Sequence, residues 1–122
     1  MTKTIGRERV LRALDHRQPD RIPVDFGGTF VSGIHVSCVL ALRDYFGLEK
    51  KPVKAIDPGQ FLGEIEEDLK LAMGIDTEGV IRRMTRFGFP AEDWKLFRMY
   101  DGAEVLVPGQ FNVTIEIGRA HV

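Results

Sequence analysis

The stretch RALDHRQPDRIPVDFGG, residues 12–28, decides how the whole fold is predicted. It begins as a charged helical run and breaks at Pro19, because the residue before a proline avoids the helical region. The next residues, 21–26, are β-prone and end at Gly27 and Gly28, which predicts a short strand followed by a sharp turn. The side chains at the carboxyl end of that strand are therefore the first candidates for a site.

An amphipathic helix is expected upstream, over residues 4–15. Val10, Leu11 and Leu14 recur at helical spacing on one face, and Arg9 points away from that face. The first 21 residues carry six Lys and Arg against three Asp and Glu, a mild basic bias that is typical of a solvated helix face.

Two more helices are expected, over residues 36–46 and 61–73. Each is followed by a glycine that ends it, Gly47 and Gly74. Residues 50–60, KKPVKAIDPGQ, are interpreted as a connection because prolines punctuate them.

The rest of the pattern is rich in β signals. Residues 75–83 predict a short strand with a loop, and residues 94–107 predict a hairpin around an Asp-Gly pair. Residues 111–116 alternate between apolar and polar. The order of elements favours an α/β fold with parallel pairing, followed by a small antiparallel β-hairpin insert.

The composition excludes several classes of protein. The 122 residues are 43% hydrophobic and 29% charged with a net charge of -1, so nothing favours nucleic acid or an anionic membrane as a partner. No apolar run approaches the roughly 20 residues of a membrane span, and no secretory leader is visible. The single cysteine, Cys38, suits a reducing compartment, so we expect a cytoplasmic protein.

The last six residues, IGRAHV (117–122), can be back-translated into the opening of a widely used sequencing adapter. The alternative is an ordinary polar terminus. We expect the adapter interpretation to hold, which removes His121 from any set of ligands. Residues 1–116 are then expected to be the N-terminal fragment of a longer domain, since a parallel sheet needs more strands and helices to bury both of its faces.

Three stretches together resemble one family. GRERVLRALDHRQPDRIPVDFGG (6–28) is similar to the opening of the uroporphyrinogen decarboxylase family, particularly its branch of decarboxylase-like and corrinoid methyltransferase-like proteins. LAMGIDTEGV (71–80) is similar to a family stretch in which a helix leads into a Gly-x-Asp strand. YDGAEVLVPGQFNVTIE (100–116) resembles a β insert of this branch.

The resemblance implies a TIM barrel whose active site lies at the carboxyl ends of its strands. Residues 21–26 would be the first barrel strand, and Asp25, Gly27 and Gly28 would bind substrate at the mouth of the barrel. His35 would lie near the same mouth as a base or a ligand. The structural alternatives are a strand-end aspartate that caps a loop amide and a histidine bonded to the backbone at a helix start.

Departures from the family pattern decide between its branches. True uroporphyrinogen decarboxylases hold the substrate carboxylates with two arginines, and here Gly28 and Ser32 fall at those positions. GVIRRM (79–84) stands where the catalytic aspartate is expected. The methyltransferase-like branch uses zinc to activate a thiol that takes a methyl group from a corrinoid. Its His and Cys ligands lie in the C-terminal half, so no cofactor is expected in this fragment and a possible zinc site lies beyond it.

Other residues with reactive or charged side chains are interpreted as structural. Cys38 is expected to be a buried small hydrophobe rather than a zinc ligand. Asp76 is expected to hold the turn between helix and strand. Three arginines are expected to form a solvated charge run rather than to bind an anionic substrate: Arg82, Arg83 and Arg86.

The sequence therefore predicts a fragment of a uroporphyrinogen decarboxylase family enzyme, inactive by itself. Its family name implies decarboxylation in porphyrin biosynthesis, and the missing arginines favour a corrinoid-linked methyltransferase instead. Its partners would be a tetrapyrrole-related substrate or a corrinoid protein, with a possible homodimer. The alternative from another class is a non-catalytic barrel domain that binds a corrinoid protein or a tetrapyrrole.

Overall fold

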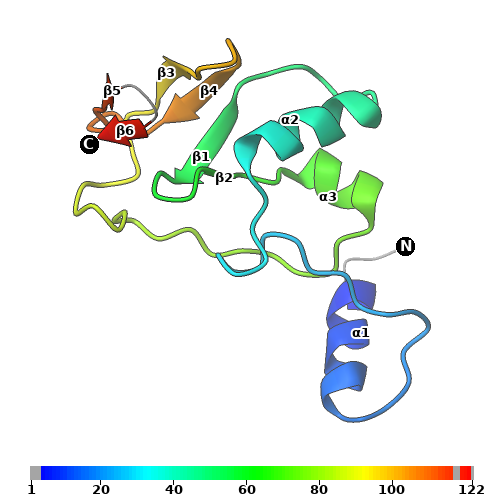
Figure 1. Cartoon of the computed structure of the whole chain (residues 1–122). Helices are drawn as coiled ribbons and strands as arrows, with labels where there is room; N and C mark the ends of the chain where they lie inside the picture. Colours follow the sequence, from blue (N-terminus) through cyan, green and yellow to red (C-terminus); the bar gives the residue numbers. More distant parts are fainter. Residues whose placement is uncertain (1–3, 117–118, 122) are drawn as a thin grey trace.

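The computed structural model describes residues 4–116 and 119–121 and shows a mixed α/β fold (Figure 1). Its described elements follow in the order α1 (Thr4–Leu14), α2 (Val36–Tyr45), β1 (Val53–Asp57), β2 (Leu62–Gly63), α3 (Glu67–Met73), β3 (Lys95–Arg98), β4 (Glu104–Val107), β5 (Thr114–Glu116) and β6 (Arg119–His121). The expectation for residues 117–122 falls partly on Ile117, Gly118 and Val122, which lie outside the described residues.

The main sheet contains four strands in the order β2-β1-β4-β3. The central pair, β1 and β4, is parallel, and both outer pairs are antiparallel. The predicted hairpin is confirmed, because β3 and β4 flank the Asp-Gly turn and pair with Leu96 opposite Leu106. Among the described strands the predicted parallel pairing is present in the pair β1 and β4, and β5 and β6 form a separate antiparallel ribbon.

The interpretation of residues 50–60 as a connection is wrong, because they contain β1, a central strand of the sheet. Val53, Ala55 and Asp57 are buried and alternate with half-buried residues, as a strand between two neighbours requires. Pro52 and Pro58 lie just outside the paired residues, so neither removes a hydrogen bond from the ladder.

The third helix was predicted to begin at residue 61, which is too early. Leu62 and Gly63 form β2, which turns back antiparallel to β1, and the helix α3 starts only at Glu67. A side chain at Gly63 would meet the Cγ2 atom of Val39 at 2.8 Å, so the strand can pack this closely on α2 only with glycine. The predicted C-terminal stop is confirmed, since Gly74 adopts the left-handed conformation with φ of 68°.

The two strands predicted at residues 21–26 and 75–83 are absent, and both segments are extended but unassigned chain. Pro23 has no N–H to donate to a ladder. The N–H of Val24 donates to the carboxylate of Asp76 and not to a carbonyl, which breaks the ladder again. These segments still lie side by side, and that arrangement forms the candidate site described below.

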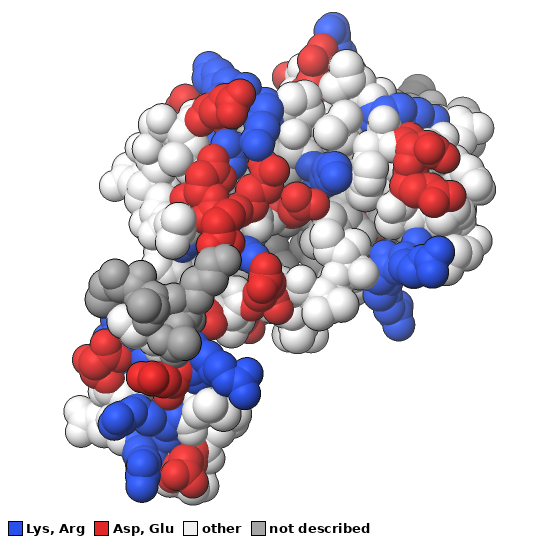
Figure 2. Space-filling model, turned by 180° about the vertical axis from the view of Figure 1, so that it is seen from behind, with Lys and Arg blue, Asp and Glu red and all other residues white. Residues whose placement is uncertain are grey.

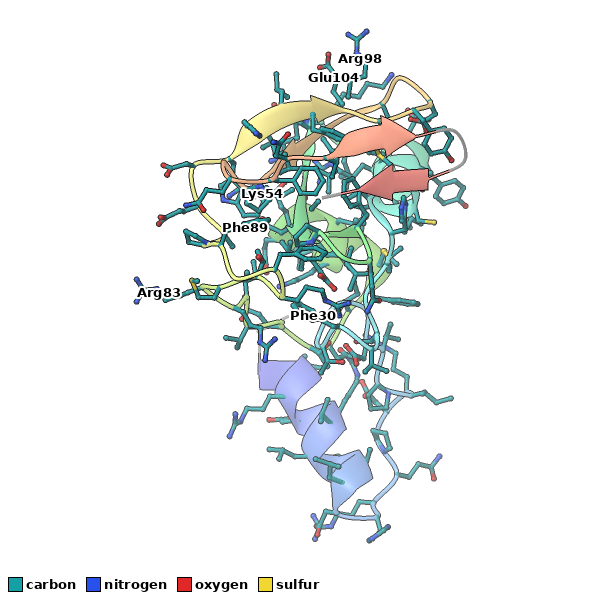
Figure 3. The ribbon with its side chains drawn as sticks, turned by 60° about the vertical axis from the view of Figure 1, so that its left-hand side comes forward. Phe30, Lys54, Arg83, Phe89, Arg98 and Glu104 are labelled. Carbon is teal, nitrogen blue, oxygen red and sulfur yellow. The ribbon has the colours of Figure 1, made fainter. Side chains whose placement is uncertain are left out.

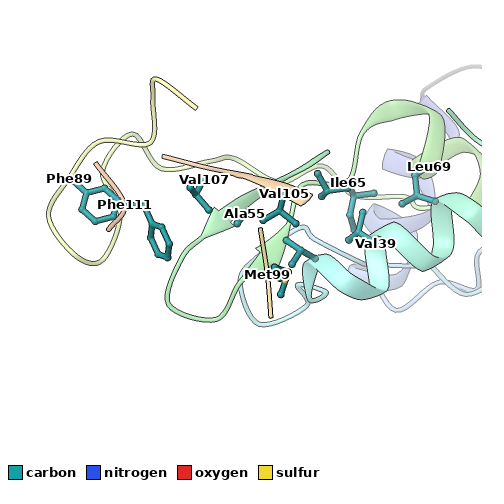
Figure 4. Close-up of a cluster of buried hydrophobic side chains, with 11 residues drawn as sticks. Val39, Ala55, Ile65, Leu69, Phe89, Met99, Val105, Val107 and Phe111 are labelled. Atoms are coloured by element: carbon teal, nitrogen blue, oxygen red, sulfur yellow. The ribbon is translucent and has the colours of Figure 1, made fainter. Parts of the chain in front are cut away.

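The core lies where α2 and α3 cover the sheet (Figure 4). Val39, Ala55, Leu69 and Val105 come from four different elements and are all fully buried. The cluster continues through three aromatic rings whose centroids lie 5.4, 5.7 and 6.1 Å apart: Phe61, Phe97 and Phe111. None of the described helices is long and apolar enough to cross a membrane.

An ion pair reinforces the packing of α2 beside α3. Arg43 on α2 is buried and donates through two nitrogens to the Asp68 carboxylate on α3, at 2.8 and 2.9 Å. The same guanidinium donates to the carbonyl of Glu49. The Arg43 contact is the largest influence on Asp68 and lowers the pKa of its carboxyl group below the ordinary value.

Helix α1 projects away from the rest of the molecule (Figure 1). Its two faces are reversed relative to an ordinary amphipathic helix, because Arg9 is buried and faces the chain. Leu11 and Leu14, which the periodicity places on one face, are 50% and 71% exposed. The expected solvated basic face therefore does not include Arg9, and the apolar face is open.

We predict that Leu69→Ala lowers the free energy of unfolding by about 2–4 kcal/mol, because it leaves a cavity under α3 in the fully buried core. Leu71→Ala is the matched control, since Leu71 lies on the same helix and is 74% exposed. Urea denaturation followed by circular dichroism measures both. Equal midpoints for the two variants would contradict the placement of α3 on the core.

Candidate functional site

The segments 21–26 and 75–83 are distant in the sequence but lie side by side and run in the same direction. Residues that face each other are 52 positions apart. The N–H of Asp76 donates to the carbonyl of Val24 at 2.8 Å, and the N–H of Val24 donates to Asp76 Oδ2 at 2.9 Å, across 52 positions. One residue further along each segment, Thr77 Oγ1 donates to Asp25 Oδ1 at 2.6 Å with the same offset of 52. The carboxyl end of the 21–26 segment therefore lies beside Thr77.

The carboxylate of Asp76 holds this pair of segments to helix α1. It accepts from Arg9 Nη1 at 2.8 Å and from Arg21 Nη1 at 3.0 Å, and its side chain is only 3% exposed. Arg9 also binds Asp20 through two nitrogens, at 2.6 and 2.9 Å. Asp76 therefore has a structural role, but a different one from that predicted: no strand follows the turn, and the carboxylate joins α1 and the 21–26 segment to its own segment.

Burial by itself would raise the pKa of Asp76, since a low-dielectric surrounding disfavours the charged form. The Val24 N–H and the two arginines outweigh that effect, so the pKa lies below its ordinary value. The carboxylate therefore stays ionised at neutral pH and keeps its cationic partners.

Three glycines allow the segments to approach one another. Gly27 turns the chain with φ of 86°, a conformation that other residues rarely adopt. A Cβ atom at Gly28 would lie 2.5 Å from Asp25 Oδ1, and one at Gly79 would collide with the carbonyl oxygen of Gly27. The predicted sharp turn is present, and the close approach at these glycines is made to neighbouring protein atoms.

Asp25 is exposed at the carboxyl end of the 21–26 segment, and hydrogen bonds hold one of its two carboxylate oxygens. Its Oδ1 accepts from Thr77 Oγ1 and from the N–H of Gly28, the latter at 3.0 Å. The Thr77 hydroxyl is the largest influence and lowers the pKa of Asp25 below its ordinary value. The loop-amide alternative for Asp25 is therefore present, and the Ser32 side chain contributes to the lowered pKa as a further hydrogen-bond donor.

A hollow of about 370 Å³ opens beside Gly27 and Gly28. Its apolar floor includes Phe30 and Ile65, and four glutamates stand against one lysine in its lining: Glu64, Glu66, Glu67, Glu78 and Lys70. Figure 2 shows acidic side chains gathered on this side of the body. The hollow therefore favours cationic or neutral groups and disfavours a ligand with many carboxylates.

His35 lies apart from the residues that line the hollow. It caps α2, where its Nδ1 accepts from the N–H of Ser37 at 3.1 Å and lies 2.8 Å from Ser37 Oγ, and it is not among the residues that line the hollow. The expectation that Cys38 is buried is wrong, because it lies exposed on α2 while Val36 and Val39 occupy the buried face. Within residues 4–116 and 119–121, no group of three or more His, Cys, Asp or Glu side chains is placed to hold a metal ion.

The arginines of the 79–86 stretch do not line the hollow either. Arg82 and Arg83 are exposed, as predicted, and Arg83 points out from the body (Figure 3). Arg86 differs from that prediction, since its Nε lies 3.6 Å from Oδ1 of the buried Asp57. Asp57 Oδ2 is buried without a hydrogen-bond partner among the described residues.

Sequence reasoning missed Thr77 and the glutamates of the hollow. No local signal marks Thr77, because its partner Asp25 lies 52 positions away and the offset follows only from the tertiary arrangement. The glutamates come from three places, the turn after β2, the start of α3 and the 75–83 segment, and only the tertiary arrangement brings them together beside Gly27.

Searches against protein-family models, curated proteins and solved structures found no match. The resemblance to the uroporphyrinogen decarboxylase family therefore stays a prediction from the sequence motifs.

We predict that Asp76→Asn lowers the free energy of unfolding by about 2 kcal/mol at pH 7, because it removes the charge that Arg9 and Arg21 bind. The folded-state pKa of Asp76 is depressed, so this contribution is present above the unfolded pKa of about 4 and is lost as pH falls below it. Urea denaturation at pH 7, 5 and about 3 measures the difference, which narrows in acid.

Asp15→Asn is the control for this experiment, because Asp15 is exposed and its pair with Arg17 spans 3.4 Å. A pH-independent difference between Asp76→Asn and the wild type would show that the charge of Asp76 is not what joins these segments.

We predict that Thr77→Val raises the pKa of Asp25 toward its ordinary value, because the hydroxyl that favours the ionised form is removed at nearly constant volume. A carbon-13 NMR titration of the Asp25 carboxyl group measures the shift. Thr85→Val is the matched control, since the Thr85 hydroxyl donates to the carbonyl of Phe89 and not to Asp25. The same Asp25 pKa in all three proteins would rule out the Asp25–Thr77 contact.

Proposed function

We propose that this chain is the N-terminal part of a uroporphyrinogen decarboxylase-like barrel enzyme of the corrinoid methyltransferase-like branch. The observation that carries the proposal is the parallel pair of segments joined through Asp25 and Thr77, because the residues that follow them, 26–28 and 78–79, line the hollow. Asp25 and Thr77 themselves precede the lining. The resemblance makes each of these two stretches a barrel strand, and α/β barrels place their active sites at the carboxyl ends of their strands.

The charge of the hollow supports methyl transfer over porphyrinogen decarboxylation. A substrate with many carboxylates needs cationic groups to hold it. The lining instead offers four glutamates and one lysine, and Arg83 and Arg86 lie elsewhere. The sequence favours the same branch, because Gly28 and Ser32 stand in place of the family's two arginines.

In this proposal Asp25 accepts a hydrogen bond from the substrate through Oδ2, while Thr77 and the Gly28 N–H hold Oδ1 in place. An ionised carboxylate with a depressed pKa binds a donor or a cation and does not act as a general acid at neutral pH. Phe30 and Ile65 in the lining offer apolar contact surface to the bound group.

The zinc ion of the family branch supplies the Lewis acid that activates a thiol when it is bound. The described residues do not fit such a site, because His35 and Cys38 are an isolated pair at the start of α2. No step proposed for the residues described above is therefore routed through zinc.

We predict that the protein expressed from its complete reading frame in the source DNA demethylates methylcobalamin in the presence of a thiol and does not release CO₂ from uroporphyrinogen. The absorbance change of the corrinoid measures the first reaction, and trapped CO₂ measures the second. Asp25→Asn is expected to lower kcat/KM about tenfold or more, because a hydrogen bond to a charged group is weakened.

Asp44→Asn is the control, since Asp44 is an exposed aspartate on α2 and is not on the 21–26 segment that leads into the hollow. CO₂ release without methyl transfer would reverse the choice of branch. Saturable binding of cobalamin with neither reaction would favour the alternative of a non-catalytic corrinoid-binding domain.

A further inference from the structure

The chain between α3 and β3 forms one wall of the hollow, where Gly79, Val80 and Ile81 belong to the lining. Residues 80–88, which we call the strap, run as irregular chain between those two elements (Figure 1). Every residue of the strap except Thr85 is exposed. A wall of the hollow is therefore made by a segment that lies on the surface of the molecule.

The strap is fixed at its two ends. Before it, Gly79 lies so close to the carbonyl oxygen of Gly27 that a side chain there would collide with it. After it, Phe89 is buried in the core cluster. Between these points the hydrogen bonds given for the strap within the described residues are internal, as from the Thr85 N–H to the Phe89 carbonyl at 2.9 Å. Hydrogen bonds therefore do not tie its middle to the body.

An ion pair makes that connection instead. Arg86 Nε lies 3.6 Å from Oδ1 of Asp57, which stands at the end of β1 and is 2% exposed. The Arg86 side chain lies on Gly59, where a Cβ atom would come within 2.6 Å of Arg86 Cδ. Ile56, which directly precedes Asp57, lines the hollow. The point where the strap meets the sheet is thus next to the hollow.

The Asp57 carboxylate has capacity for a closer contact. Its Oδ1 accepts from the Gly59 N–H at 3.1 Å, and its Oδ2 is buried without a hydrogen-bond partner among the described residues. A guanidinium group offers N–H donors in the geometry that matches two carboxylate oxygens. An inward movement of Arg86 by about 1 Å brings it within hydrogen-bond distance. Because a buried carboxylate without a cation is strongly disfavoured, Asp57 favours the position in which the strap is closed.

We propose that the strap is a movable wall of the hollow and that Arg86, bound to Asp57, is the catch that holds it closed. When Arg86 leaves Asp57, Val80 and Ile81 move with the strap and the hollow opens to a ligand. Segments with few buried contacts are the ones that open locally and gate a site. The inference rests on the proposed function only in taking the hollow as the substrate site.

The first test measures where the strap lies, with spin labels on the native Cys38 and on Arg83→Cys in the full chain. Cys38 is exposed on α2, and the Arg83 side chain points out from the body (Figure 3). Double electron–electron resonance gives the distribution of distances between the two labels. We expect one narrow distance in this protein. After Arg86→Gln we expect a second distance whose population rises about tenfold, because the catch is lost.

Gly59→Ala is expected to act in the same way, because it displaces the guanidinium and leaves both charges in the chain. Arg86 and Gly59 are exposed residues, so both variants are expected to fold, and circular dichroism checks this. Arg82→Gln is the matched control, since Arg82 is exposed on the same strap and has no ion pair within the described residues. One unchanged distance in both test variants, or a second distance in the control, would overturn the proposal.

The second test connects the strap to the hollow. Ile56→Cys together with Cys38→Ser places a single thiol in the lining. The rate of its reaction with N-ethylmaleimide, followed by mass spectrometry, measures access to the hollow. We expect Arg86→Gln to raise this rate about threefold or more. The rate at Val31→Cys, which is 98% exposed and outside the lining, is expected to stay the same.

A strap that moves while the Ile56→Cys rate stays constant would show that it does not close the hollow, and the proposal would be wrong. Neither measurement uses a corrinoid or a methyl group. A failure of the proposed methyl transfer therefore leaves both results interpretable, and an immobile strap leaves the proposed reaction untouched.

Discussion

The Asp76 carboxylate is the contact on which the N-terminal half of the structure depends. One buried group receives donors from α1, from Arg21 and from the backbone of Val24, so three segments that share little apolar surface meet at a single charge. A buried carboxylate is tolerated only when donors surround it, and here they fill both oxygens. The same contact sets Val24 opposite Asp76 and therefore Asp25 opposite Thr77, so the geometry of the candidate site follows from it.

The contact with Asp76 also explains why α1 buries its arginine and exposes its leucines. An arginine that binds two aspartates holds the helix by its polar side, and Leu11 and Leu14 on the other side stay 50% and 71% exposed. Ionic and apolar preferences cannot both be met by one short helix that packs against a single body. This conflict leaves part of the apolar face of α1 in water.

Local sequence patterns predicted several helices and turns of the fold, but they did not predict which strands pair. The 36–46 helix and the Asp-Gly hairpin were predicted correctly, because each is specified by residues close in sequence. The strand β1 was missed because its flanking prolines imitate a loop, and the strand at 21–26 was predicted although an aspartate side chain replaces the ladder there. At the candidate site, Asp25, Gly27 and Gly28 were identified and are adjacent, whereas His35 was identified and lies apart.

The sequence by itself determined the elements whose causes are local: where α2 and α3 stop, where the hairpin turns, and which glycines permit a sharp bend. Only the tertiary structure decided which carboxylate receives Arg9, that Thr77 fixes Asp25, and that four glutamates from separate segments line the hollow. The physical reason is that hydrogen bonds and ion pairs act over a few ångströms in space. Partners separated by 52 or 67 positions leave no periodic trace in the chain that joins them.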